Sequence, residues 1–288
     1  MARLQKKIER DIERASAREM QEMLSELLIG TDTMSEEEQK LRRQQMIQRI
    51  EAKCEELRRK IKILEQDAGG KGWDFSKEKE LDTFAEDEMI FLRNCCDSEK
   101  KAYIQIKKEN TDTPELYDDE NAIEVTWNMF NSERSFCCSI IRKVDNKFLG
   151  YISIKDTKSN LWEMAIEMLQ EHCRKGYGLR AIALFLPAVS KITDKSQFQA
   201  LVETDNIPSQ KLMEKSGAKL IDIYDYSFHG DEAAAIAFEE KNISEITERM
   251  VELAEQLGVE PRKMLSHVLD YRFFIQEGKI LNMSREKR

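Results

Sequence analysis

The sequence predicts an α/β (α+β) protein in which an antiparallel meander is flanked by helices. Composition is the first indication, because 35% of the 288 residues are charged, 41% are hydrophobic and only 4 are proline, a balance typical of long solvated helices. The second is a run of three strand-like segments, 136–143, 148–155 and 160–169. The third is that the last segment enters a glycine turn followed by a helix.

The first 67 residues are expected to form a helical hairpin or coiled coil. Residues 1–28 carry an amphipathic stripe that ends near Gly30, and Ser35 with Glu38 forms a capping box for the next helix. The second helix has the seam of a coiled coil, whose partner is either the first helix folded back or a second subunit or other protein. The seam residues are Ile47, Ile50, Cys54, Leu57, Ile61 and Leu64.

Three glycines within 68–72 mark the clearest boundary of the chain, so we place a linker at 68–87, with a small helix near 81–88. Residues 88–240 change to shorter elements and are expected to form the main domain. Besides the meander, we expect a strand at 89–93, helices from Ser98 and after Pro114, a strand at 198–203, a short helix behind Pro208 and a strand at 218–228.

Residues 241–288 are expected to form a C-terminal helical extension that covers the domain or offers a partner surface. Gly258 and Pro261 separate two amphipathic stretches there. Their apolar positions are Ile246, Met250, Leu253 and Leu257 in the first stretch and Met264, Val268, Phe273 and Phe274 in the second.

Charge and composition exclude several classes of partner. The formal net charge of -9 argues against nucleic acid as the main ligand, and no apolar run is long enough to span a membrane, so we expect a cytoplasmic protein. The six cysteines form no C-x-x-C motif, so we expect them to be small buried side chains in a reducing compartment. Because the three histidines are also scattered along the chain, we expect no metal site. These cysteines are Cys54, Cys95, Cys96, Cys137, Cys138 and Cys173.

The stretch 162–181 is the most informative part of the chain, because it reads as strand, glycine loop and helix. Gly176 and Gly178 allow close approach of the backbone, and amides from Arg174 through Leu179 would meet at the positive end of a helix dipole. Lys175 and Arg174 add positive charge. Such a junction suits the phosphates of a nucleotide-like cofactor.

Three ordered pieces of sequence resemble the GNAT superfamily of N-acetyltransferases, in particular the branch similar to ribosomal-protein N-terminal acetyltransferases. The first is LGYISI at 149–154, and the second is WEMAI at 162–166, which runs without a gap into RKGYG at 174–178. The third is NIPSQKLMEKSGA at 206–218. The resemblance covers roughly residues 88–240, about half of the chain.

The resemblance implies a mixed, mostly antiparallel sheet and acetyl-CoA as the acetyl donor. It also implies that the pyrophosphate binds the glycine loop, that the pantetheine arm pairs with the backbone at the end of the acidic strand, and that side chains near residue 206 contact the cofactor. The implied cofactor-binding residues are Met168, Leu169, Arg174, Lys175, Gly176, Tyr177, Gly178, Leu179, Asn206 and Ser209.

Acetyl transfer to an amine needs a proton acceptor and a donor for the developing oxyanion. Glu163 and Glu167 are the candidate bases, because they alternate on one strand face with the small Ala165 between them. Glu163 is favoured, since it occupies the position of the family's strand glutamate, while an ordinary solvent-facing strand edge would show the same alternation. The amide of Met168 is the candidate oxyanion donor.

Two departures from the family pattern leave two functions open. Cys173 replaces the usual Arg or Gln of the pyrophosphate motif, and Met213 replaces a tyrosine that protonates the leaving thiolate in many members; Tyr177 is near in sequence. The first hypothesis is an N-acetyltransferase acting by direct attack of a primary amine, namely a protein N-terminus, a lysine or a small amine. The second is a GNAT-fold interaction protein or CoA-binding scaffold without catalysis.

Overall fold

The computed structural model describes residues 72–282, apart from residues 112 and 229–230. The expected helical hairpin or coiled coil at 1–67 lies outside these residues. Two compact units divide the described part: residues 225–245 contribute to one, and the remaining residues form the other. Among the described helices, none combines the length and the apolar character needed to cross a membrane.

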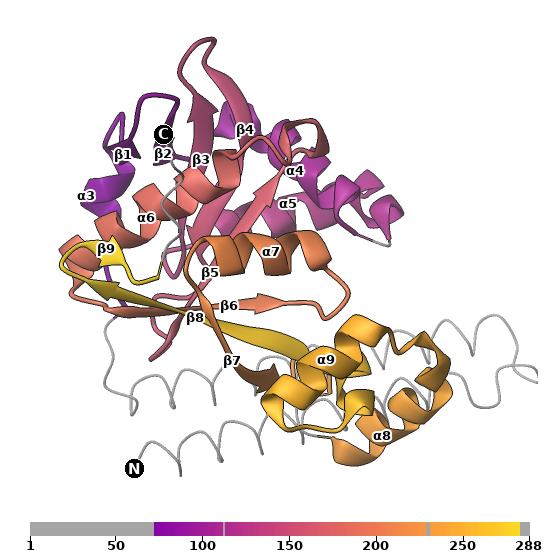
Figure 1. Ribbon diagram of the computed structural model, residues 1–288. Helices are drawn as coiled ribbons and strands as arrows, with labels where there is room; N and C mark the ends of the chain where they lie inside the picture. The colour runs from indigo at the N-terminus through magenta and orange to yellow at the C-terminus, as the bar shows by residue number, and fades with distance from the viewer. Residues whose placement is uncertain (1–71, 112, 229–230, 283–288) are drawn as a thin grey trace, which may run out of the picture. The chain divides into compact units, whose positions relative to one another are not determined.

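One sheet organises the larger unit, and within the described residues its strands follow the order β1-β2-β3-β4-β5-β6-β8-β7, with β9 paired to β8 (Figure 1). Every pairing is antiparallel except that of β5 with β6. The predicted mixed, mostly antiparallel sheet is therefore confirmed. The strands are β1 (Ala85–Glu86), β2 (Ile90–Asn94), β3 (Phe136–Arg142), β4 (Lys147–Ile154), β5 (Trp162–Met168), β6 (Gln197–Val202), β7 (Lys219–Tyr224), β8 (Val268–Gln276) and β9 (Lys279–Ile280).

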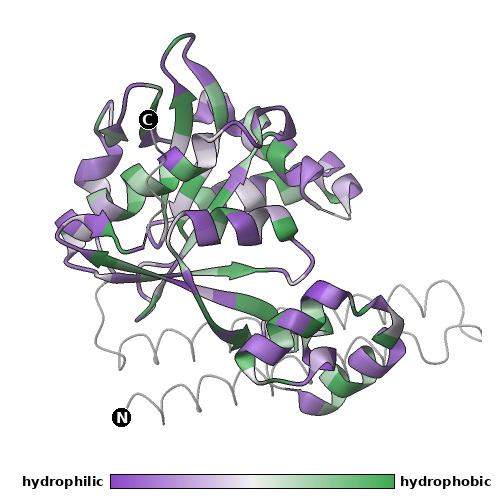
Figure 2. Ribbon diagram, viewed as in Figure 1, coloured by the Kyte–Doolittle hydropathy of each residue, from purple (hydrophilic) through white to green (hydrophobic). Residues whose placement is uncertain are grey.

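The α-helices of this unit cover both faces of the sheet. They are α3 (Ser76–Lys79), α4 (Lys100–Glu109), α5 (Glu120–Phe130), α6 (Tyr177–Thr193), α7 (Ile207–Lys215) and α9 (Glu248–Leu257), and the smaller unit contains α8 (Glu232–Lys241). Short 3-10 turns lie at Asp97–Glu99, Pro114–Asp118, Gln170–His172, Ile243–Glu245 and Pro261–Leu265. Hydrophobic residues concentrate in the strands, while the helices alternate hydrophobic and hydrophilic residues (Figure 2).

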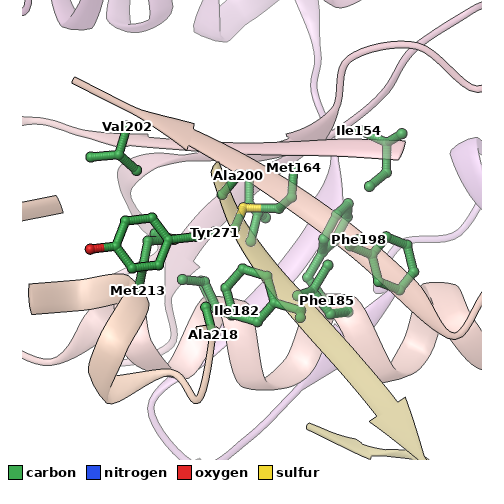
Figure 3. Packing of buried hydrophobic residues seen from close by; sticks show 14 of the residues in the cluster. Ile154, Met164, Ile182, Phe185, Phe198, Ala200, Val202, Met213, Ala218 and Tyr271 are labelled. Carbon is green, nitrogen blue, oxygen red and sulfur yellow. The ribbon is translucent and has the colours of Figure 1, made fainter. Parts of the chain in front are cut away.

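Two hydrophobic clusters hold the helices to the sheet. The larger one packs the buried face of α6, including Ile182 and Phe185, against β6 and β8, and Met213 of α7 joins it (Figure 3). The smaller one lies on the opposite face, where Tyr103 of α4 stacks on Tyr151 of β4 at a centroid distance of 5.0 Å. Burial of such aromatic side chains stabilises the fold by roughly 1.5–3 kcal/mol each.

The segment predicted as a linker at 68–87 is, over its described part, built into the domain. Phe75 is buried and stacks on Phe136 of β3 with 4.2 Å between ring centroids. The small helix expected near 81–88 is wrong, because Ala85–Glu86 pairs as β1 with β2. The few aromatic residues of this charged segment give no extended periodic signal, and for that reason the pattern missed the burial of Phe75.

The second C-terminal helix is also wrong. The first amphipathic stretch forms α9, but Val268–Gln276 forms β8, which lies between β6 and β7 in the sheet. Leu269, Tyr271, Phe273 and Ile275 alternate into the core with period two, and this burial outweighs the chance helical spacing of Met264 and Val268. Residues 241–288 are therefore not a purely helical extension, since they complete the sheet.

Candidate functional site

Strand β5 has a free edge beside the point where it leaves β6. The parallel pairing of the two strands covers only Trp162 with Phe198 and Glu163 with Gln199, after which β6 continues along β8. Figure 1 shows β6 turning away from β5. The rest of β5, Ala165 to Met168, is paired with β4 alone.

Backbone hydrogen bonds show which amides lie at this free edge. Lys155 donates its amide to the Glu163 carbonyl at 3.0 Å, and Leu169 donates to the Leu149 carbonyl at 3.0 Å, so the odd-numbered residues of β5 bond toward β4. Successive residues of a strand direct their N-H and C=O groups to opposite edges. The amide of Met164 falls within the pairing with β6, so the amides of Ile166 and Met168 line the free edge.

Leu169 does not share this position. Its N-H bonds to β4, and its carbonyl accepts a hydrogen bond from the His172 amide at 2.9 Å. Its side chain packs against the smaller hydrophobic cluster. Both backbone groups of Leu169 thus have partners within the protein, and its pairing with a cofactor stays a prediction.

The glycine loop presents a row of free amides at the start of α6. Gly176 is the N-cap residue with φ of 82°, and Arg174 also has a positive φ of 60°. The first bond of the helix runs from the Arg180 amide to the Gly176 carbonyl, and among the described residues the amides of 174–179 have no hydrogen-bond partner. Free amides at a helix N-terminus bind phosphate groups.

The surroundings of this loop fit a pyrophosphate. A β-carbon at Gly176 would meet no atom within 4 Å, whereas one at Gly178 would lie 3.3 Å from Leu212 Cδ2 and 3.4 Å from Met168 Sδ. The loop is therefore open at Gly176, and Gly178 lets α6 approach β5 closely. Arg174 and Lys175 are exposed and make no ion pair within the described residues. An anion would find both free amides and unpaired cations there.

Glu163 and Glu167 lie on the opposite face of β5 from the core residues Met164 and Ile166, as the alternation predicts. Glu163 and Glu167 are four positions apart on the strand, a span of about 13 Å along the backbone. One reacting atom is thus within direct reach of only one of them. The Glu163 carboxylate is paired with Lys155 at 2.5 Å, and the Lys155 side chain is half exposed.

Glu167 is held more firmly, by three side chains from β4 and the end of α4. Its Oε1 atom contacts both the ammonium of Lys107 and the hydroxyl of Tyr151, and its Oε2 atom accepts a bond from Asn110 Nδ2 at 3.4 Å. Tyr151 lies directly opposite Glu167 in the β4–β5 pairing. Burial, followed by the charge of Glu167, raises the pKa of Tyr151 well above its usual value, so the hydroxyl remains a donor.

The end of α4 is also joined to the loop after β5. Glu109 accepts a hydrogen bond from the Gln170 amide at 2.9 Å, and Gln170 Nε2 donates to the Glu109 carbonyl at 3.2 Å. Lys107, Asn110 and Tyr151 were not among the predicted site residues. The hairpin register could have placed Tyr151 opposite Glu167, but no local signal in α4 identifies Lys107.

Comparison with known proteins agrees with this geometry. Residues 80–219 match the family model described as an acetyltransferase (GNAT) domain. This domain belongs to the GNAT family. The resemblance to the GNAT superfamily noted in the sequence is therefore confirmed. Among curated proteins, none matches this chain.

Solved structures similar to the chain include GNAT acetyltransferases of low sequence identity. One is a GNAT-family acetyltransferase from Bacillus anthracis, with 14% identity, a TM-score of 0.44 and coverage of 66% of this chain and 97% of that chain. Another is a ribosomal-protein-S5-alanine acetyltransferase from Vibrio fischeri, with 11% identity, a TM-score of 0.43 and coverage of 67% of this chain and 97% of that chain. A third is Mycobacterium smegmatis RimJ in complex with CoA-disulfide, with 13% identity, a TM-score of 0.44 and coverage of 65% of this chain and 83% of that chain.

The remaining residues of the GNAT pattern have local structural roles. Asn206 caps α7 by accepting a hydrogen bond from the Ser209 amide at 3.1 Å. Met213 is buried in the core. The Tyr177 side chain is buried too and belongs to the larger hydrophobic cluster.

Two further groups lie beside the glycine loop of the GNAT domain. Cys173 is exposed with its thiol 3.5 Å from the Leu169 carbonyl, and partial burial with the nearby Glu109 raises its thiol pKa. His172 is buried, and its Nε2 atom lies 3.0 Å from Glu171 Oε1 without hydrogen-bond geometry. Burial lowers the pKa of His172, which favours its neutral form.

Proposed function

We propose that this protein is an N-acetyltransferase that moves an acetyl group from acetyl-CoA to a primary amine by direct attack. The free edge of β5 is the observation that supports this most, because it joins the glycine loop at one end and carries two carboxylates on one face. Amides at that edge are suited to bind an extended pantetheine arm and to stabilise an oxyanion. Acetyl-CoA, when bound, would supply an activated thioester.

The chain contributes binding groups and a proton acceptor. The free amides of 174–179 with Arg174 and Lys175 would hold the pyrophosphate. The Met168 amide would donate to the oxyanion that develops on the acetyl carbonyl. Glu163 would accept a proton from the acceptor amine through water, because it lies five positions before Met168 on β5. Its partner among the described residues is a half-exposed lysine, and such pairs are weak.

Release of free thiol from acetyl-CoA, measured with a panel of peptides and polyamines, tests this function. We expect turnover with at least one amine, and a Glu163→Gln variant that retains acetyl-CoA binding but loses about 100-fold or more in turnover. Lys155→Gln is the matched control, since it removes the ion pair and leaves the carboxylate in place. Tight acetyl-CoA binding without turnover on any amine would favour the scaffold hypothesis instead.

A further inference from the structure

The Lys107 side chain occupies a site built for an ammonium ion. Its Nζ atom contacts Oε1 of Glu167 and lies 5.5 Å from the ring centroids of both Phe130 and Tyr151. A carboxylate beside two aromatic faces is an arrangement that binds alkylammonium groups. The Lys107 and Glu167 side chains are about three-quarters buried, so this pair is shielded from solvent more than an ordinary surface pair.

Among the side chains that bond Glu167, only Lys107 can become a nucleophile at neutral pH. Tyr151 keeps its proton because burial and the neighbouring carboxylate oppose its ionisation. The amide nitrogen of Asn110 is a hydrogen-bond donor without a basic lone pair. The Lys107 ammonium yields a primary amine when it gives up one proton, and the Glu167 carboxylate in contact with it can accept that proton.

The same amine is bonded through Glu167 to β5, the strand that carries the reacting edge. Glu167 stands between Ile166 and Met168, whose amides line the free edge where the proposed function places the acetyl group. Lys107 reaches this point from α4, whose C-terminal end is tied to the loop after β5 by the Glu109 and Gln170 bonds. An internal amine held at the reaction centre has the high effective concentration of an intramolecular reactant.

We propose that Lys107 is a modification site of this protein, acetylated within its own chain by bound acetyl-CoA. This inference rests on the proposed function. Glu167 takes one proton from the Lys107 ammonium and passes it to solvent, and the free amine forms a C-N bond to the acetyl carbon. The C-S bond breaks, its electron pair leaves with the CoA sulfur, and the second proton lost by nitrogen goes to that thiolate. The products are N-acetyl-lysine and free CoA.

Acetylation would change the site as well as the residue. It removes the positive charge that faces Glu167 and the two aromatic rings. Glu167 then keeps only Tyr151 and Asn110 as partners among the side chains that bond it in the described structure. The carboxylate becomes available to the ammonium of an incoming acceptor.

The test incubates the full chain with deuterated acetyl-CoA and locates the label by mass spectrometry of peptides. Lys108 is a matched internal control, because it is the next residue, is similarly exposed and is also paired with a carboxylate, Asp118. We expect label at Lys107 in about tenfold or greater excess over Lys108. We also expect Glu167→Gln to lower the label at Lys107 by about 100-fold, and Lys107→Arg to remove it.

Equal labelling of Lys107 and Lys108 would overturn the inference, since non-enzymatic acetylation has no preference of this kind. Calorimetry of acetyl-CoA on the same samples separates two failures. Intact binding without label at Lys107 overturns this inference alone, whereas absent binding overturns it together with the proposed function. A measurement without acetyl-CoA adds a second readout. We expect Lys107→Gln to lower the melting temperature, because it removes the positive charge beside Glu167, and we expect the labelled protein, freed of cofactor, to melt at the same lowered temperature. An unchanged melting temperature would contradict the placement of Lys107.

Discussion

Replacing Gly150 by alanine should break the contact between β4 and β5 where the site is built. A β-carbon at Gly150 would lie 2.3 Å from the Glu167 carbonyl oxygen and 2.7 Å from the Met168 Cα atom. Both are backbone atoms of a paired strand, so they cannot turn away as a side chain does. Overpacking of a core costs about 1–3 kcal/mol, and we expect Gly150→Ala to reach about 3 kcal/mol because the whole strand must move.

Gly178→Ala is the matched control. The atoms nearest its β-carbon would be side-chain atoms, Leu212 Cδ2 at 3.3 Å and Met168 Sδ at 3.4 Å. Alanine also gains about 1 kcal/mol of helix propensity over glycine, which offsets part of the crowding. Urea unfolding followed by tryptophan fluorescence measures both variants, since Trp162 is fully buried in the native state. A Gly150→Ala protein as stable as the Gly178→Ala protein would refute the register of β4 and β5.

Three other perturbations test separate parts of the structure. Gly176→Ala should lower the free energy of unfolding by about 1–2 kcal/mol and weaken acetyl-CoA binding, because φ at this position is 82°. Unchanged stability in urea and unchanged binding by calorimetry would contradict the loop conformation. His172 has a lowered pKa in the folded protein, so the unfolded chain takes up its proton first and stability should fall as the pH drops below about 6.5. The melting temperature of His172→Gln should therefore fall less than that of the native protein between pH 7.5 and 5.5, buffer values about one unit either side of that pKa. The same fall in both proteins would count against this role of His172. Phe75→Ala should cost about 3–5 kcal/mol in urea unfolding, and a loss under about 1 kcal/mol would show that this segment is not part of the core.

Local patterns predicted the elements whose signal lies within a few residues. The meander of β3, β4 and β5 follows from alternation and a polar turn, and the glycine loop follows from the spacing of Gly176 and Gly178. The alternation of Glu163 and Glu167 on one face of β5 follows from the two-residue period of a strand. In each case the sequence neighbours are also the structural neighbours.

Long-range pairing decided what the patterns missed. Val268–Gln276 has a mixed apolar spacing, and only its insertion between β6 and β7 fixes it as a strand. The bonds of Leu169 depend on the register with Leu149, which a strand period alone does not give. Lys107 and Glu167 are 60 residues apart, and their contact exists only because α4 packs across β4 onto β5.

Calorimetric titration of the full chain with acetyl-CoA tests the central claim most directly. The claim is that the free edge of β5 and the open amides of 174–179 form one site for this cofactor. We predict saturable binding with one molecule per chain, weakened in Gly176→Ala and retained in Glu163→Gln. Absence of binding by the native chain would contradict both the acetyltransferase and the CoA-scaffold hypotheses.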